Sequence, residues 1–289
     1  MMSVSAAPQA SRGLAVAKVL RQRKPLALGM ALLLVIVVLC VFAPLFAPYD
    51  PNKLSISSRL IAPGADHLFG TDELGRDVFT RAIYAGRTSL IIGAAATIFA
   101  SVIGIALGLA AGFFRRTDVI IARIIDAMMA FPDILLAIAL VAALGPSAAT
   151  VIVALGIVYT PRLARIVRAS TFVIRELPYV EAARALGVPT WRILYRHVLR
   201  NLLSVIMVQA TFIFAYAILA EASLTFLGVG VSPDIPTWGT MIAAGRQYVG
   251  QADWMTVFPG LAIILSVMAL QLVGDGLRDL LDPRLRKDL

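Results

Sequence analysis

Long apolar blocks dominate the hydrophobic pattern of this chain, and short polar segments separate them. About 20 consecutive apolar residues cross the hydrocarbon of a bilayer as a helix, and each block is close to this length. The blocks cover residues 26–47, 89–114, 124–144, 148–169, 202–224 and 257–274. We therefore predict an all-α membrane protein with six transmembrane helices.

The third apolar block is the least continuous of the six. Asp126 and Asp133 interrupt it, and Pro132 stands where a helix would break, because proline has no backbone N–H to donate. Arg123 and Arg162 are the candidates to neutralise these carboxylates. A broken span with a structural ion pair is therefore expected here.

Composition agrees with this picture. Hydrophobic residues make up 60% of the 289 positions, against about 45–50% in a typical soluble domain. The net charge is +9, but the cations lie between the apolar blocks, so we expect no nucleic-acid partner. Cys40 is the only cysteine and is interpreted as a small core residue. His67 and His197 are predicted on opposite sides of the membrane, so we expect no metal site.

Lysine and arginine are concentrated in alternate segments, and the positive-inside rule makes the richer side cytoplasmic. Both termini are then cytoplasmic. The first apolar block exceeds the roughly 7–15 residues of a signal peptide, so it is predicted to be retained. The predicted organisation is a cytoplasmic tail (1–25), a first transmembrane helix (26–47), an external segment with an interfacial helix (48–88), a five-helix core (89–274) that contains a cytoplasmic segment (171–200), and a cytoplasmic tail (275–289).

The cytoplasmic segment predicts two short helices. Pro178 suits a first helical position, Gly187 suits the left-handed residue after a helix, and Pro189 prevents continuation. The resulting helix has about two turns and needs a docking surface, because so short a helix is unstable alone in water. A second helix from Thr190 carries arginines at every fourth position, which favours a location along the lipid headgroups.

The motif Glu181-Ala182-Ala183, followed after three residues by Gly187, resembles the EAA loop of permeases in ATP-binding-cassette (ABC) importers. The family's continuation, Ile-x-Leu-Pro, is not matched at 197–200. In that family the loop forms a coupling helix that inserts into a separate ATPase subunit. The resemblance thus implies contact with an ATPase through Tyr179, Glu181, Ala182, Ala183, Arg184, Leu186 and Gly187.

A stretch from His67 to Arg81 resembles the signature before the second span of the second, C-type permease of dipeptide, oligopeptide and nickel importers. On a helix, Asp72 and Asp77 would pair with Arg76 and Arg81 at a spacing of four. Two interpretations remain open. The charged residues either form an ion-paired interfacial helix at the pore mouth or contact the substrate or a docked binding protein through Asp72, Glu73, Arg76, Asp77 and Arg81.

Three later stretches, 220–230, 236–239 and 274–284, resemble the same family. The first contains Glu221, near the outer end of the fifth block. An ionisable group at membrane depth is a functional candidate, but one near the interface can also anchor structure. Both a structural and a pathway role remain open for Glu221.

The chain has no G-x-x-x-x-G-K-[ST] loop to hold ATP phosphates. The resemblance implies a type I ABC importer permease of the bacterial inner membrane that carries peptides or a related small solute. It also implies a second, different permease, two ATP-binding subunits that hold ATP and Mg²⁺, an external substrate-binding protein and membrane lipid as partners. An ion-coupled carrier or a membrane-embedded enzyme are the alternatives, but no inverted repeat or catalytic constellation indicates either.

Overall fold

The computed structural model describes residues 23–281, so most of the predicted N-terminal tail and residues 282–289 of the C-terminal tail lie outside the described residues. The described part is helical and contains no strand, only an isolated bridge between Thr71 and Asp77. Its helices are α2 (Lys24–Val41), α3 (Ala43–Phe46), η1 (Ile56–Ser58), α4 (Val78–Phe113), α5 (Arg115–Met129), α6 (Asp133–Leu144), α7 (Ala148–Arg175), α8 (Pro178–Ala185), α9 (Thr190–Ile193), η2 (Leu194–Leu199), α10 (Arg200–Phe226), α11 (Trp238–Gly245), η3 (Arg246–Tyr248) and α12 (Trp254–Leu281).

Six apolar crossings are confirmed when a bent pair is taken as one span. Five helical stretches are long and apolar enough to cross a membrane: α2, α4, α7, the continuous run from α9 to α10, and α12. The sixth is α5 with α6, which meet at an angle of 93°. The bend lies at the predicted break, where Pro132 precedes α6.

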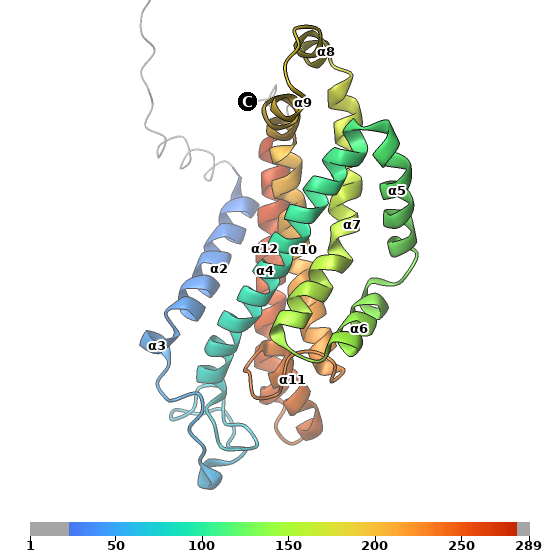
Figure 1. Cartoon of the computed structure of the whole chain (residues 1–289). Helices are drawn as coiled ribbons and strands as arrows, with labels where there is room; N and C mark the ends of the chain where they lie inside the picture. The colour runs from blue at the N-terminus through green and yellow to red at the C-terminus, as the bar shows by residue number, and fades with distance from the viewer. Residues whose placement is uncertain (1–22, 282–289) are drawn as a thin grey trace, which may run out of the picture.

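The helices run roughly along one direction, with α8 and α9 at one end and α11 with the loop before α4 at the other (Figure 1). The first and last described residues lie at the end that carries α8. There Arg23 Nη1 lies 3.4 Å from Asp279 Oδ2. This arrangement agrees with an even number of crossings and with both termini on the cytoplasmic side.

Close contact between α4 and α7 depends on small residues. Gly104, Gly108 and Gly112 recur every fourth position on one face of α4, and α7 packs against that face. A Cβ added at Gly108 would lie 2.6 Å from the Cβ of Val167 and 2.7 Å from the carbonyl oxygen of Ala164. Small residues permit such approach in membranes, where van der Waals packing drives helix association.

Gly108→Ala is therefore expected to destabilise the fold by about 1–3 kcal/mol, because the backbones of α4 and α7 must separate. Thermal unfolding of the detergent-purified protein would measure the loss. Gly260→Ala on α12 is the matched control, since its added Cβ has no atom within 4 Å. Equal stability of the two variants would contradict the packing role of Gly108.

Three predicted boundaries are wrong. The helix α4 begins at Val78, so residues 78–88 are continuous with the helix of the second block and do not form a separate interfacial helix. Asp77 sets this start because its side chain accepts the backbone N–H of Thr80. The predicted headgroup helix from Thr190 is instead continuous with the fifth span, through the π-helical turn η2. The first block is divided at Phe42 into α2 and α3.

The predicted partners of the aspartates in the third span are also corrected. Arg165 Nη2 lies 2.7 Å from Asp126 Oδ1, and Arg168 pairs with Asp118. These contacts join α7 to α5. Within residues 23–281, neither Arg123 nor Arg162 forms an ion pair with Asp126 or Asp133, and Asp133 has no ion-pair partner there. The rotation of α7 about its axis decides this, because it turns Arg165 and Arg168 toward α5.

Candidate functional site

The charged residues before α4 form a tight turn, not the predicted helix. Asp72 is 5% exposed, and its Oδ1 accepts the backbone N–H groups of Leu74 and Arg76, each at 2.9 Å. Its Oδ2 accepts Arg76 Nε at 2.6 Å and lies 3.5 Å from Arg81 Nε. The predicted Asp72–Arg76 pair is therefore present, but the carboxylate also closes the turn. One buried acid organises the whole loop.

The predicted Asp77–Arg81 pair is wrong. Asp77 Oδ2 accepts the backbone N–H of Thr80 at 2.8 Å and so caps α4, while Oδ1 lies 2.9 Å from His67 Nδ1. Arg81 donates instead to the carbonyl oxygen of Pro51 at 3.2 Å. As the N-cap, Asp77 directs its carboxylate toward the backbone N–H groups of the first turn. It therefore forms no ion pair with Arg81, although the two residues are four positions apart.

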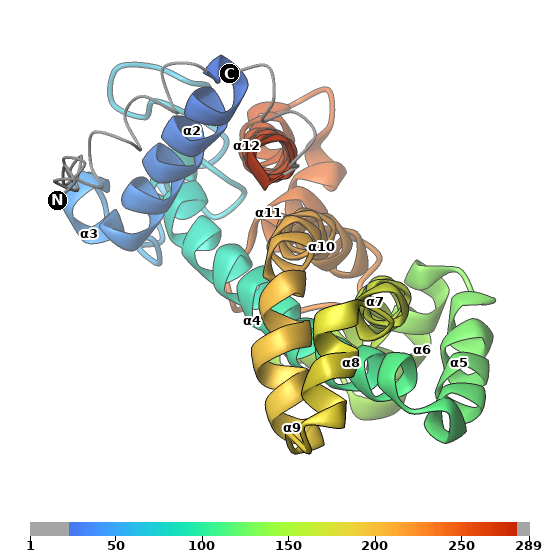
Figure 2. The same ribbon diagram turned by 90° about the horizontal axis from the view of Figure 1, so that it is seen from above.

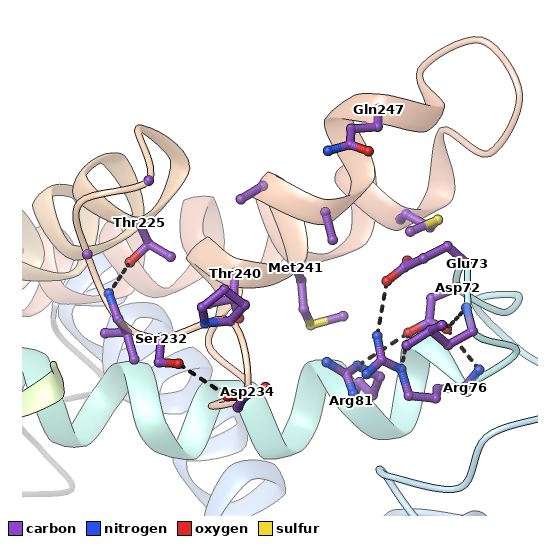
Figure 3. Close-up of a pocket in the computed structure, with 18 of the residues that line it drawn as sticks. Asp72, Glu73, Arg76, Arg81, Thr225, Ser232, Asp234, Thr240, Met241 and Gln247 are labelled. Carbon is purple, nitrogen blue, oxygen red and sulfur yellow. Dashed lines mark hydrogen bonds and ion pairs between the residues drawn. The ribbon is translucent and has the colours of Figure 1, made fainter. Parts of the chain in front are cut away.

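A cavity of about 570 Å³ lies beside this turn and α11 (Figure 3), at the end of the molecule opposite α8 (Figure 1). Arg76 Nη2 donates to Glu73 Oε1 at 3.1 Å, but Glu73 Oε2 is buried with no hydrogen-bond partner among residues 23–281. Side chains from the second external segment complete the wall. They include Thr225, Ser232, Asp234, Thr240, Met241 and Gln247.

These later residues were missed by the sequence prediction. They lie roughly 150 positions from the turn along the chain, and no motif links them to it. The structure joins the two external segments through aromatic contacts as well. Trp254 Nε1 donates to the carbonyl oxygen of Thr71 at 2.9 Å, and the rings of Phe69 and Phe258 stack at 3.8 Å.

Glu221 is fully buried and does not line this cavity. Its Oε2 accepts the hydroxyl of Ser89 at 3.2 Å, and its Oε1 accepts the hydroxyl of Thr225 at 3.1 Å. Ser89 Oγ in turn accepts the backbone N–H of Trp238 at 3.1 Å. The carboxylate thus connects α10, α4 and the start of α11, which supports the structural alternative for this residue.

The helix α8, in the segment predicted to be cytoplasmic, has the predicted ends. Pro178 occupies its first turn, and Gly187 follows its end with φ at +73°. Behind the glycine, the N–H of Val188 donates to the carbonyl oxygen of Ala183 at 3.0 Å, which closes the helix as a Schellman motif does. Local chemistry therefore fixes where this short helix starts and stops.

One face of α8 packs against the protein and the other is open. Val180 is fully buried and Ala183 is 7% exposed, whereas Leu186 is 83% exposed. Glu181 and Ala182 are also exposed. The structure thus divides the predicted coupling residues: Ala183 packs against the protein, whereas Glu181, Ala182 and Leu186 are exposed.

Two further contacts fix the orientation of α8. Arg184 Cζ lies 4.7 Å from the ring centroid of Phe113, the last residue of α4. Asn201 Nδ2 donates to Tyr179 Oη at 3.1 Å, which connects α8 to α10. These two contacts connect α8 to the membrane-spanning helices α4 and α10.

The comparisons with known proteins decide the family. Residues 100–287 match the family described as "Binding-protein-dependent transport system inner membrane component", and residues 13–63 match "N-terminal TM domain of oligopeptide transport permease C". The chain belongs to the binding-protein-dependent permease family. It is thus a transport permease subunit of an ABC importer and an inner-membrane protein, and the predicted recognition is confirmed.

Two relatives and one solved structure illustrate how far the similarity to this permease extends. A peptide transport system permease protein of Brucella suis is 49% identical over 270 residues, which is 93% of this chain and 91% of that one. The dipeptide transport system permease protein DppC of Alkalihalophilus pseudofirmus is 43% identical, over 93% and 89% of the two chains. A chain of the inward-facing MetNI methionine ABC transporter has a TM-score of 0.56 at 20% identity, covering 68% of this permease and 93% of that chain. The last similarity supports the type I importer fold.

Proposed function

We propose that this permease and a second, different permease form the path by which peptides or related small solutes enter the cell. Two ATPase subunits would supply the energy, and an external binding protein would supply the cargo. The names of the relatives support peptides as the cargo. The pairing with a different permease is supported by the match to a C-type permease domain, which implies a distinct partner type.

The observation that carries the coupling proposal is the exposed face of α8. Tyr179 in the first turn of α8 is 43% exposed, and Leu186, the residue that caps its end, is 83% exposed. Apolar side chains displayed at a cytoplasmic end are costly in water and suit a protein partner. We propose that the ATPase receives this face, with Glu181, Ala182 and Gly187 at its edge.

ATP and Mg²⁺ would be bound by the partner subunits, since the sequence of this chain has no phosphate-binding loop. Closure of the ATPase pair around ATP would draw the two coupling helices together. Through Arg184 on Phe113 and Tyr179 on Asn201, this movement would reach α4 and α10. The membrane-spanning helices would then favour the outward-facing conformation, because the ATP-bound ATPase pair would bind that conformation more tightly. Hydrolysis of ATP would restore the inward-facing conformation.

At the external end, we propose that the cavity beside Asp72 receives cargo from the docked binding protein. Asp72, Arg76, Asp77 and Arg81 all have partners within the chain, so their proposed role is to hold the shape of the loop. Glu73 differs, because one of its carboxylate oxygens has no partner among the described residues. It is the proposed contact for an incoming cationic or N–H group.

Leu186→Lys is expected to reduce co-purification of the ATPase subunits with this permease by about tenfold, because burying an unpaired ammonium opposes docking. Affinity purification from membranes, followed by quantification of each subunit, would measure the loss. Leu68→Lys is the matched control, since Leu68 is 60% exposed in the external segment. Full retention of the ATPase by the Leu186 variant would refute docking through α8.

A further inference from the structure

An arginine and a tyrosine meet midway along α7, where this helix packs beside α10. Arg162 Cζ lies 4.8 Å from the ring centroid of Tyr216, which joins α7 to α10. Arg162 is 14 residues from Ala148 and 13 from Arg175, the two ends of α7. At 1.5 Å per residue it lies about 20 Å from each end. Tyr216 remains 43% exposed.

Arg162 differs from the other arginines of α7. Arg165, Arg168 and Arg175 each form an ion pair with a carboxylate. Within residues 23–281, Arg162 forms neither an ion pair nor a side-chain hydrogen bond, and its contact is the tyrosine ring. A charge at this depth faces a bundle interior or a water-filled cavity, because contact with lipid is costly. We therefore interpret the exposed surface of Arg162 and Tyr216 as part of the wall of the translocation pathway.

A separate cavity supports the same side. It has a volume of about 460 Å³ and is lined by residues one turn beyond Arg162 and Tyr216, toward the end of the molecule that carries α8, and not by the pair itself. Ile166, one turn after Arg162, and Phe212, one turn before Tyr216, line its start, and Ser204, Gln209 and Arg278 add polar atoms. In the view along the helices, α10 lies between α7 and α12, the three helices that contribute these residues (Figure 2).

We propose that Arg162, supported by the ring of Tyr216, binds a carboxylate of the cargo midway along the translocation pathway. This inference rests on the proposed function, because it assigns a contact residue to the proposed peptide cargo. It concerns the interior of the membrane and neither the external cavity nor α8.

The chemistry of the pair suits a carboxylate. Guanidinium offers five donors in one plane and binds a carboxylate through two parallel N–H···O bonds. An aromatic ring attracts the cation by its face, so the N–H donors at the edge of the guanidinium stay available. A second contact joins α7 to the backbone of α10 at this position, since the hydroxyl of Tyr159 donates to the carbonyl oxygen of Tyr216 at 3.3 Å.

A carboxylate also suits a pathway that accepts different peptides. Every unmodified peptide has one at its C-terminus, whereas its side chains vary. A single cation at mid-depth would therefore recognise cargo without regard to sequence. The cavity toward the cytoplasmic end would then receive the released peptide through hydrogen bonds from Ser204, Gln209 and Arg278.

The test uses the assembled complex of both permeases and both ATPases. Binding of dialanine and of its C-terminal amide is measured by competition-mode ligand NMR on the detergent-solubilised complex without binding protein. The unmodified complex is expected to prefer the free acid by about tenfold or more, as expected for a charge-assisted hydrogen bond. Arg162→Gln should remove this preference, and Arg162→Lys should keep part of it.

The matched control is Arg246→Gln. Arg246 also lies over an aromatic ring, that of Phe226 at 5.3 Å, but at the external end. This variant should keep the preference for the acid. An Arg162→Gln complex that keeps the preference would overturn the inference, as would an unmodified complex with no preference. Loss of the second permease from the Arg162→Gln complex would likewise overturn it, because it would assign Arg162 to the subunit interface.

Uptake by proteoliposomes that contain the unmodified complex and its binding protein separates this inference from the proposed function. If the proteoliposomes take up dialanine but the NMR measurement shows no preference for the free acid, the proposed function stands and the inference is overturned. No ATP-dependent uptake of any peptide would overturn the proposed function and the inference with it.

Discussion

Gly187→Val is expected to reduce ATP-driven uptake by about tenfold or more, while the permease still inserts into the membrane. Gly187 has a φ of +73°, and no atom lies within 4 Å of an added Cβ. The effect is therefore one of backbone conformation and not of collision. A non-glycine residue in the left-handed region costs about 1–2 kcal/mol, and a β-branched side chain is especially unfavourable there.

The strain would be relieved by unwinding the end of α8. The bond from the N–H of Val188 to the carbonyl oxygen of Ala183, which closes the helix, would be lost. Leu186 and Tyr179 would then no longer be held as one surface. Uptake and ATP hydrolysis stimulated by the loaded binding protein, both measured in proteoliposomes, should fall together.

Gly187→Asn is the control for this prediction, because asparagine tolerates the left-handed conformation far better than valine does. It should retain most of the uptake. If the valine variant transported as well as the asparagine variant, the conformation at Gly187 would have no part in coupling. An equal loss in both variants would indicate instead that the ATPase requires the absence of a side chain at this position.

Glu221→Leu is expected to destabilise the permease by about 2 kcal/mol or more, since two buried hydroxyl groups lose their acceptor and each orphaned donor costs about 1–3 kcal/mol. Ser89 and Thr225 both donate to this carboxylate, and Glu221 is fully buried. Thermal unfolding of the detergent-purified protein would measure the loss. The attachment of α11 to α4 should loosen at the same time, because Ser89 also accepts the N–H of Trp238.

Glu221→Gln is the milder variant for comparison. Its amide oxygen still accepts one hydroxyl, and the other hydroxyl can rotate to accept from the amide nitrogen. It should retain most of the stability. A glutamine variant that is fully stable but transports poorly would contradict the purely structural role and return Glu221 to the candidates for the pathway.

The number of crossings and their order could be predicted from the sequence, because each apolar block is long enough to span the hydrocarbon regardless of what surrounds it. The bend of the third crossing was visible too, since Pro132 acts on its own backbone. The same holds for α8, where Pro178 and Gly187 define the ends through local geometry. These features depend on residues a few positions apart.

The external site was predicted in part. The acidic and basic residues before α4 were identified, and the Asp72–Arg76 pair is present. The sequence does not predict their conformation. Asp72 accepts two backbone N–H groups and closes a turn, whereas the spacing of the charges predicts a helix. The opposite wall of the cavity, with Ser232 and Thr240, comes from a segment far along the chain, and no local pattern points to it.

The sequence by itself determined how many times this permease can cross the membrane and where the short helix α8 starts and ends. The tertiary structure decided which charges meet. Asp126 pairs with Arg165 rather than Arg123 or Arg162, Glu221 is enclosed by hydroxyls, and Arg162 is left facing Tyr216. The physical reason is that hydrophobic length fixes a span, whereas the partner of a side chain depends on the rotation and crossing of helices, which only packing between them sets.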